Sequence, residues 1–543
     1  MTVSVKTLGW LFGVLAAIFV VVEQRDVGIA RDEVVYMQAG AKYAAWWVHF
    51  ADHGFDARSI TQTFGGGSPT DNNREHPPLM KTWFGLSELV LHQKLGALDE
   101  VTAFRLPSAV MHGVGVVLVF RFALALWGLG EAILAALVLI GLPRALFHAG
   151  LACFDAPSMT LWFATVVAYW HAMEGRRWPW PVGVVWGLAL ATKHTALLVP
   201  FALGVHYLVV GWRASQGAGG VAARLRATIA YRGRVIVSLV VLGPLTLFVV
   251  WPWLWIDPIH HVADWLAFHL HHVHYNYEYL GRNWNAPRFP WHVALVTTLF
   301  TVPVATLAAA LIGAGAWLTQ RERSLPGAPA LLLALSAAAS IGPFFLGTTP
   351  IFGAEKHWMP ALPTICIAAG VGVVWVARRA VQGLAWLPEA AVIAGLGGLV
   401  VLAAASEVSV AEPYALTWYN TLAGGAPGGA DLGMNRQFWG VAARGVLPAL
   451  AQAAGPSLTS VYTHDASPAW GTYQRAGVIS RSLIDAGPEQ AGIDRSQLAL
   501  VIHELHFNRH DFMIWSSYGT VQPIFVLRAA GVPIVSLYRR PPK

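Results

Sequence analysis

The chain has 543 residues, of which 56% are hydrophobic and only 12% are charged, and its mean hydropathy is +0.52. A soluble domain carries about 25% charged residues, so this composition excludes an ordinary soluble enzyme and indicates a protein that crosses a membrane several times. The formal net charge of +7 comes from basic residues in short loops between apolar runs, which favours a role in topology over nucleic-acid binding. Cys153 and Cys366 both lie in apolar runs, so no disulfide framework is implied.

Membrane spans are the first elements that the sequence predicts. A transmembrane helix needs roughly 20 mostly apolar residues, and on this rule we expect about eleven spans. The first apolar run, Leu8 to Val22, resembles a signal peptide but has no small-x-small cleavage site before Glu23, so we interpret it as a retained span. The expected spans begin near Leu8, Phe104, Glu131, Ala156, Pro179, Ala196, Val235, Trp291, Leu325, Trp358 and Trp386, and the last ends near Ala405.

Basic residues lie on one side of the predicted bundle. By the positive-inside rule that side is cytoplasmic, which places the N-terminus inside. An odd number of spans then places the C-terminal tail outside, together with the 31–103, 150–157, 257–290 and 347–357 segments. The one-sided basic residues are Lys6, Arg176, Arg177, Arg213, Arg224, Arg226, Arg232, Arg234, Arg321, Arg323, Arg378 and Arg379.

The tail after residue 405 differs in character from the rest of the chain. It contains alternating runs such as SLTSVYTH, QLALVIHEL and PIFVLRAAGVPIVSLY, separated by Gly and Pro turns. This pattern predicts a small α/β domain in water. We therefore expect a transmembrane domain over 1–405, with a first external loop over 29–103, and an extracytoplasmic domain over 406–543.

Two adjacent carboxylates, Asp32 and Glu33, follow the first span by only a few residues. An acid at a membrane boundary is a functional candidate by default, although a solvated loop acid next to a helix end is the simpler alternative. The motif EHPPL at 75–79 lies in the same external segment, where two prolines stiffen the backbone and orient the residues before them. This segment is polar and rich in aromatic residues, so we expect it to fold rather than to form an open loop.

Basic side chains also occur near the outer ends of several spans. A snorkelling Arg or Lys is common, but Arg144 lies too deep in its apolar run to reach water easily. Acids beside several cations at one membrane face suit an anionic lipid head group next to a carboxylate that can accept a proton. The candidate catalytic residues are Asp32 and Glu33, and the candidate substrate-binding residues are His76, Arg105, Arg144, Asp155, Lys193, His194, Lys356 and His357.

The run HLHHVHYNYEY at 269–279 is rich in histidine. Four histidines in six positions suggest a metal site, but the HxHHxH spacing does not match the common ligand spacings. We therefore predict neither a metal nor another cofactor, and we interpret the run as a contact surface for a head group or an acceptor.

Taken in order, these motifs resemble family 39 of the C-type glycosyltransferases, which holds protein O-mannosyltransferases and bacterial lipid A aminoarabinose transferases. The order of the motifs covers the chain to about residue 405. The tail sequence YNTLAGGAPGGADLGMNRQFWG, at 419–440, is similar to a signature that follows the last span in some prokaryotic members. The matching segments are RDEVVY (31–36), EHPPLMKTW (75–83), FRLPSAVMHG (104–113), PRALFHAGLACFDAP (143–157), GLALATKHTALLVP (187–200) and EKHWMPALP (355–363).

The resemblance implies a polytopic helical fold and an inverting sugar transfer in the bacterial inner membrane. The donor would be a polyprenyl-phosphate sugar, and the acceptor a hydroxyl of a protein, lipid or glycan. Asp32 matches the catalytic base and Asp155 the second acid of the family. Arg105, Arg144 and Lys193 match basic positions near the lipid phosphate. Family members are generally taken to work without a metal, although some C-type relatives use one.

Two other functions remain as alternatives. A flippase or transporter for a lipid-linked sugar needs polar residues along its whole path and internal repeats, whereas the polar residues here gather on one side. A ligase-type relative would differ in its acceptor and in the length of its donor. The transferase chemistry needs only one base, because cations can stabilise the departing phosphate, unlike glycoside hydrolysis with its two carboxyl groups.

Overall fold

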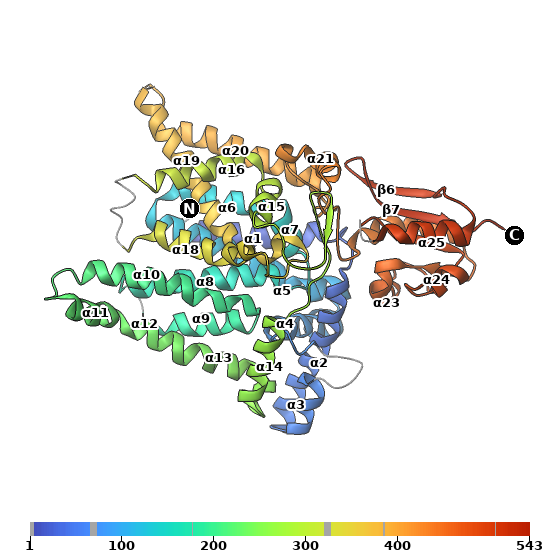
Figure 1. The fold of residues 1–543 in the computed structure, drawn as a ribbon, viewed down its shortest axis with the longest axis horizontal. Helices are drawn as coiled ribbons and strands as arrows, with labels where there is room; N and C mark the ends of the chain where they lie inside the picture. Colours follow the sequence, from blue (N-terminus) through green and yellow to red (C-terminus); the bar gives the residue numbers. More distant parts are fainter. Residues whose placement is uncertain are drawn as a thin grey trace.

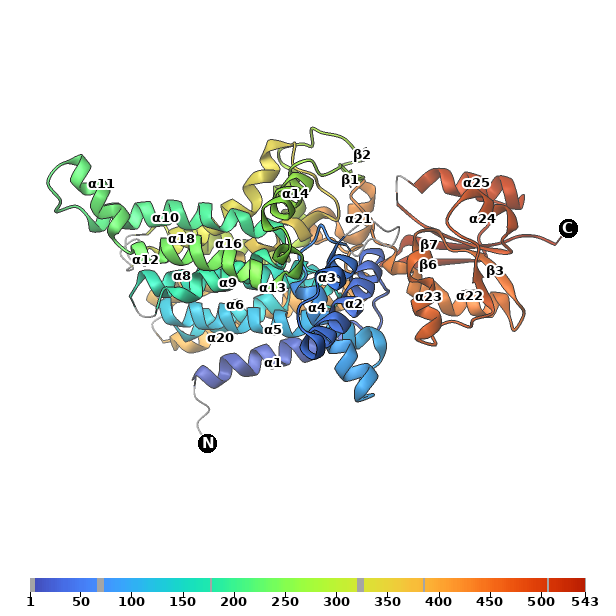
Figure 2. The same ribbon diagram turned by 90° about the horizontal axis from the view of Figure 1, so that it is seen from below.

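The computed structural model describes residues 5–65, 73–175, 178–319, 327–383, 386–504 and 507–542. Its helices form an elongated bundle, and a smaller sheet domain lies at one end of it (Figure 1). α1 begins at the other end of the bundle and runs toward the sheet domain (Figure 2). The predicted span start at Leu325 and the basic residues Arg176, Arg177, Arg321 and Arg323 lie outside the described residues.

Seven helical segments within the described residues are long and apolar enough to cross a membrane. The helices α6 (Leu129–Ile140) and α7 (Pro143–Ala149), bent by 67° at their junction, give an eighth if they count as one span. The prediction of a polytopic helical membrane protein is confirmed. The seven segments are α1 (Val5–Glu23), α5 (Glu100–Leu126), η2–α10 (His194–Ala214), α12–α13 (Gly233–Val250), α18–η5 (Pro329–Leu346), η7–α19 (Met359–Gly383) and α20 (Glu389–Ala411).

The other predicted spans are also helical, but each departs from a straight apolar helix. α8 (Asp155–Met173) has 19 residues and a polar first turn, and it is not among the seven segments that are apolar enough to cross a membrane. α9 (Trp180–Leu190) has only 11 residues. The segment predicted from Trp291 is divided into α15 (Val293–Thr301) and α16 (Val304–Ala316). Counting apolar residues therefore overstated the number of uninterrupted spans.

Small residues let the bundle helices approach closely. A Cβ on Gly13 of α1 would lie only 2.7 Å from the carbonyl oxygen of Gly113 in α5. α16 and α19 make a similar contact, since a Cβ on Gly313 or Gly372 would overlap the backbone of the other helix. Close packing of small residues is a main source of helix association in membranes.

The first external segment is folded, as its composition predicted. It forms α2 (Arg31–His53), α3 (Ala57–Phe64) and α4 (Leu79–Ser87), which continues into η1 (Glu88–Lys94). Asp56 caps α3 by accepting hydrogen bonds from the backbone of Arg58 and Ser59, as expected for an N-cap acid. Trp46 is buried and donates to Ser59 Oγ at 3.0 Å, which fastens α3 to α2.

The predicted external segments gather at the end of the bundle that carries the sheet domain. α2, α3, α14 (Pro258–Leu270) and the hairpin of β1 (Tyr277–Tyr279) and β2 (Arg282–Trp284) all lie there (Figures 1 and 2). The basic segment that contains α11 (Val221–Ala230) lies at the opposite end. The predicted external segments and the basic segment around α11 are therefore separated along the long axis of the bundle.

The tail forms a small α/β domain, as predicted. Its sheet has the strand order β4-β3-β5-β7-β6, with β3 parallel to β4 and β5, and with β7 antiparallel to β5 and β6. Helices cover both faces of the sheet (Figure 2), so the central strand LALVI is buried at every residue, as expected for a strand covered on both sides. The elements are α22 (Leu447–Ala454), β3 (Thr459–Tyr462), α23 (Ser467–Arg475), β4 (Leu483–Asp485), α24 (Gln490–Arg495), β5 (Leu498–Ile502), α25 (Asn508–Tyr518), β6 (Phe525–Ala529) and β7 (Val532–Arg539).

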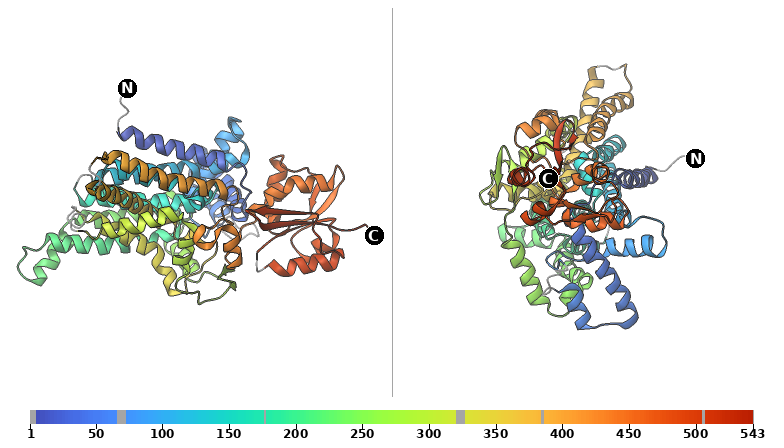
Figure 3. Two further views of the ribbon diagram at one scale, coloured as in Figure 1. Left: turned by 90° about the horizontal axis from the view of Figure 1, so that it is seen from above. Right: turned by 90° about the vertical axis from the view of Figure 1, so that its right-hand side faces the viewer.

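The sheet domain and the end of the bundle that carries it share one apolar core. A single buried cluster contains Val34 of α2, Phe154 before α8, Trp439 of the connecting segment and Leu500 of β5. Seen from the domain's end, the sheet domain lies over the middle of the bundle, and the helices of the first external segment extend beside it (Figure 3). The domain is thus packed onto the region that holds the candidate site.

Candidate active site

Glu33 lies fully buried in the first turn of α2. Its carboxylate accepts hydrogen bonds from Arg105 Nε and Nη2, both at 2.8 Å. It also accepts from the backbone N–H of Ala30 at 2.9 Å and of Ala152 at 2.7 Å. A carboxylate has about four acceptor sites, so the structure leaves Glu33 little capacity to bind a substrate or to take up its proton.

Arg105 is equally occupied. Besides its two bonds to Glu33, its Nη1 donates to the carbonyls of Gln24 and Val27, and its Nη2 to that of Gly28. These bonds use all five N–H groups of a guanidinium. Arg105 thus connects α5 to the turn between α1 and α2, and its expected place near the lipid phosphate stays a prediction.

Asp32 points elsewhere, because successive residues of a helix are about 100° apart. Its side chain is 28% exposed. One carboxylate oxygen lies 3.9 Å from Lys356 Nζ, and the other lies 3.9 Å from Arg31 Nε. Of the tandem acids, Asp32 is the one that a substrate can reach.

Two buried lysines lie between Asp32 and a second acid. Lys193 Nζ donates to Asp155 Oδ1 at 2.7 Å, and the other carboxylate oxygen of Asp155 lies 4.0 Å from His148 Nδ1. Lys193 Nζ also lies 3.5 Å from the carbonyl oxygen of Lys356. Burial lowers the pKa of the Lys356 ammonium, while Asp32 and Asp155 act in the opposite direction. The sequence-predicted residues Asp32, Lys356, Lys193 and Asp155 therefore form one cluster.

Arg144 is held on the far side of this cluster. Its Nη1 pairs with Glu355 at 2.9 Å, and its Nη2 donates to the carbonyls of Leu416 and Trp418 at 3.0 Å each. Glu355 also lies 3.4 Å from His148 Nε2, which links it to the Asp155 side of the cluster. These bonds tie α7 to the chain after the last span, so most of the Arg144 guanidinium is used within the protein.

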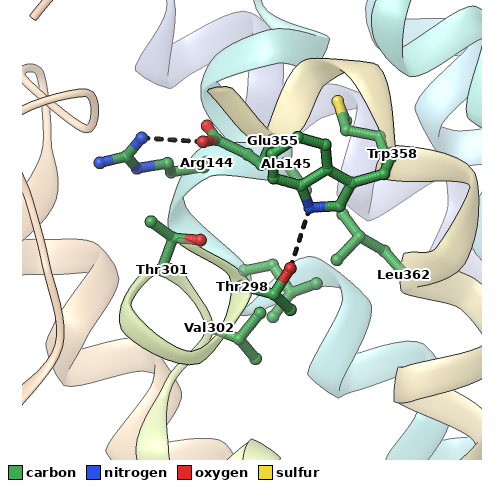
Figure 4. Close-up of a pocket in the computed structure, with 10 residues that line it drawn as sticks. Arg144, Ala145, Thr298, Thr301, Val302, Glu355, Trp358 and Leu362 are labelled. Atoms are coloured by element: carbon green, nitrogen blue, oxygen red, sulfur yellow. Dashed lines mark hydrogen bonds and ion pairs between the residues drawn. The ribbon is translucent and has the colours of Figure 1, made fainter. Parts of the chain in front are cut away.

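A small cavity adjoins Arg144 (Figure 4). Its volume of about 20 Å³ leaves space for roughly one water molecule. Figure 4 shows the Arg144–Glu355 pair beside it, and Trp358 Nε1 donating to Thr298 Oγ1 at 2.9 Å. The cavity is too small to hold a sugar. Arg144 Nε has no hydrogen-bond partner within the described residues.

The predicted histidines gather around the EHPP motif. His269 of α14 stacks on His194 with ring centroids 3.7 Å apart, and its Nε2 lies 3.0 Å from the carbonyl oxygen of Glu75. His76 lies 5.9 Å from His269, ring to ring. Burial lowers the pKa of His76 well below its ordinary value and that of His269 to about 4, so both rings are neutral at pH 7. His357 instead bonds to the backbone of Phe352, with Nε2 2.6 Å from the carbonyl oxygen.

The histidine-rich run packs onto neighbouring loops. His272 stacks on Phe352 of the 347–357 loop with ring centroids 5.3 Å apart, and His274 packs against Phe289 at 5.6 Å. Among the described residues, no group of three or more His, Cys, Asp or Glu side chains is arranged to hold a metal ion. The run therefore joins α14 to the loops that border the site.

Sequence reasoning missed several residues of the site. Glu355 and His148 bridge the acidic and basic groups. Both stand inside the motifs quoted above, Glu355 directly before Lys356 and His148 in the same motif as Arg144 and Asp155. Trp439 belongs to the FWG sequence of the tail, and its ring centroid lies 4.0 Å from Lys356 Nζ. The tail signature at 419–440 includes this residue, but the sequence does not indicate that its ring contacts Lys356.

Comparisons with known proteins bear on the fold. The family model described as dolichyl-phosphate-mannose-protein mannosyltransferase matches residues 76–252. The structure of ArnT from Cupriavidus metallidurans in the apo state is similar over 97% of both chains, with a TM-score of 0.53 and 14% identity. The same protein bound to undecaprenyl phosphate matches over 97% of both chains, with a TM-score of 0.51 and 16% identity. No curated protein matches the sequence.

The chain has the fold of the C-type glycosyltransferases. The resemblance recognised from the motifs is thereby confirmed. The matched residues 76–252 contain the HPPL part of the EHPPL motif and the FRLPS, DAP and TKH motifs, whereas Asp32 precedes them. The role of Asp32 therefore depends on its geometry in this structure.

Proposed function

We propose that this protein is an integral-membrane inverting glycosyltransferase, which moves a sugar from a polyprenyl-phosphate donor to an acceptor hydroxyl on the extracytoplasmic face. The observation that carries the proposal is the partly exposed carboxylate of Asp32, with the buried ammonium group of Lys356 3.9 Å away. An accessible base next to cations suits an acceptor hydroxyl and an anionic leaving group. The family match and the fold support this class of reaction.

In the proposed reaction, Asp32 accepts the proton of the acceptor hydroxyl. The oxygen of that hydroxyl attacks the anomeric carbon of the donor sugar at the same time. The bond from that carbon to the phosphate oxygen breaks, and the configuration inverts because a single displacement occurs. The departing polyprenyl phosphate gains one negative charge as Asp32 loses one. Lys356 then loses its anionic neighbour Asp32 at the moment when the phosphate gains a charge. Lys193 lies beside Lys356 and can also stabilise that phosphate.

The other predicted residues take supporting roles in this proposal. Asp155 holds Lys193 in place, and the histidines around His76 border the acceptor or head-group side. Glu33 and Arg105 fix the start of α2, so they position Asp32 without contacting a substrate. The undecaprenyl phosphate bound to the ArnT relative supports a polyprenyl donor lipid.

We also propose the orientation of the chain. The N-terminus and the basic loops lie in the cytoplasm, while the site and the sheet domain lie outside the bacterial inner membrane. The domain division at about residue 405 belongs to the same proposal, and α20 continues to Ala411 before the chain leaves the bundle. The acceptor is a protein, lipid or glycan hydroxyl.

The function is tested by incubating the purified protein with a panel of polyprenyl-phosphate sugars and candidate acceptors. The expected result is release of polyprenyl phosphate together with a glycosylated acceptor. A flippase would move the lipid-linked sugar across proteoliposomes and release no polyprenyl phosphate. Absence of glycosyl product with every donor of the panel would contradict the transferase.

A further inference from the structure

Trp439 returns from the tail to the centre of the candidate site. Its side chain is buried, and its ring centroid lies 4.0 Å from Lys356 Nζ. The ring also meets that of His148 edge-on, with centroids 5.9 Å apart. Its backbone carbonyl accepts a hydrogen bond of 2.9 Å from the N–H of Arg31, the residue before Asp32. One residue of the tail thus touches both the ammonium group and the helix start that carries the proposed base.

The backbone at this position is unusual. Trp439 has φ of 70° and Gly440 has φ of 73°. A left-handed conformation is rare for a bulky residue and persists only where the surroundings enforce it. A Cβ on Gly440 would lie 2.8 Å from the carbonyl oxygen of Asp465, so the sheet domain packs directly against this turn.

The sheet domain also fixes the turn that precedes α2. Asp465 pairs with Arg31 at 2.9 Å, and the hydroxyl of Tyr473 accepts a hydrogen bond of 2.8 Å from the N–H of Ile29. A Cβ on Gly28 would overlap the carbonyl oxygen of Val441. The tail therefore contacts the turn before α2 through an ion pair, a hydrogen bond and close backbone packing.

We propose that Trp439 is a positioning residue for sugar transfer, which holds Lys356 beside Asp32 through a cation–π contact and anchors the N-terminus of α2. The sheet domain is then part of the catalytic unit, because Asp465 and Tyr473 hold the same turn. This inference rests on the proposed transferase function.

The surroundings of Lys356 explain why an aromatic ring matters there. The ammonium group is buried, and burial lowers its pKa. A cation over the face of Trp is stabilised, and more so when desolvated. The ring therefore favours the charged form without adding a carboxylate that would compete with the phosphate. The titratable groups facing Lys356 are Asp32 of α2, Asp155 of α8, Lys193 before η2, Cys153 of the preceding turn and the neighbouring His357.

The test compares Trp439→Leu with Trp439→Phe. Leucine removes the ring, so we expect kcat to fall by about 2- to 30-fold, and the basic limb of its pH profile to move about 0.4–1.5 pH units lower. Phenylalanine keeps a ring, so the kcat and the basic limb of Trp439→Phe should lie between those of Trp439→Leu and wild type. KM for the acceptor should change little in either variant. Equal impairment of both variants, with an unshifted basic limb, would overturn the inference.

A matched control separates positioning from docking of the domain. Arg475 of α23 pairs with Glu100 at 3.1 Å, which links the same domain to α5. Arg475→Gln should keep the wild-type kcat and pH profile. Loss of kcat in this control as large as in Trp439→Leu would overturn a specific role for Trp439.

A second variant keeps the test valid if Trp439→Leu fails to fold. Lys356→Arg retains a positive charge at every accessible pH, so the basic limb should disappear. Persistence of that limb would show that it does not report Lys356, and the inference would fail. A wild type that transfers no sugar contradicts the proposed function itself. An active wild type, together with a Trp439→Leu variant whose kcat and pH profile are unchanged, contradicts only this inference.

Discussion

Arg105 and Glu33 share two hydrogen bonds of 2.8 Å in the interior of the protein, and both side chains are almost completely buried. The neighbouring acid, Asp32, keeps 28% of its side chain exposed. Two adjacent carboxylates thus have different environments: one is sealed in a structural ion pair and the other is available for chemistry.

Glu33→Gln should reduce the stability of the folded protein. Removing one partner of a buried pair leaves the other charge uncompensated, which costs about 3–5 kcal/mol. We expect a lower midpoint of thermal unfolding and poor recovery in detergent. Glu100→Gln, which breaks a partly exposed pair with Arg475, is the control and should change the midpoint little. A Glu33→Gln protein as stable as wild type, but inactive, would instead place Glu33 in the chemistry.

Lys193→Ala should weaken binding of the lipid-linked donor. Its ammonium group has one carboxylate partner, Asp155 at 2.7 Å, and a charge-assisted bond to a phosphate is worth about 1.5–3 kcal/mol. Donor affinity, measured by titration with a polyprenyl-phosphate sugar, checks this. Unchanged affinity in a folded variant would restrict Lys193 to pairing with Asp155.

Arg144→Ala should primarily reduce stability. Its guanidinium is bonded to Glu355 and to the carbonyls of Leu416 and Trp418. Truncation therefore removes the cation beside a buried carboxylate and takes a donor away from two backbone carbonyls. We expect thermal unfolding at lower temperature, which circular dichroism can follow. If the variant had wild-type stability but reduced donor affinity, Arg144 would instead bind the lipid phosphate, as the sequence predicts.

The orientation of the chain can be tested by cysteine labelling. Gly217 has open space around its Cα, and the Leu458 side chain is 70% exposed in the sheet domain. With an impermeant thiol reagent, Gly217→Cys should react only from the cytoplasmic side and Leu458→Cys only from outside. The native residues Cys153 and Cys366 are buried and give a low background. Labelling of Gly217→Cys from outside would reverse the proposed topology.

The sequence predicted the class of fold because apolar runs, basic loops and a polar tail are properties of composition. It also located the cluster at the candidate site, since Asp32, Asp155, Lys193 and Lys356 stand in motifs at the ends of predicted spans. It could not distinguish Asp32 from Glu33, because their difference arises from the direction in which each side chain leaves α2.

Long-range contacts explain the other differences. Arg105 and Arg144 carry the charge expected of phosphate ligands, but their donors bond to backbone carbonyls far away in the sequence. The contact of Trp439 with Lys356 depends on the packing of the sheet domain onto the bundle. No local pattern encodes either arrangement.

The central claim is that Asp32 is the base of a sugar transfer, and Asp32→Asn tests it most directly. The amide keeps the size of the side chain but cannot take up the proton, and loss of a general base typically costs about 10²–10⁴ in rate. Release of polyprenyl phosphate should be measured under saturating donor and acceptor, with donor affinity and thermal unfolding determined on the same preparation. We expect a folded protein that binds donor like wild type and transfers almost no sugar, whereas full transfer by Asp32→Asn would show that Asp32 is not the base.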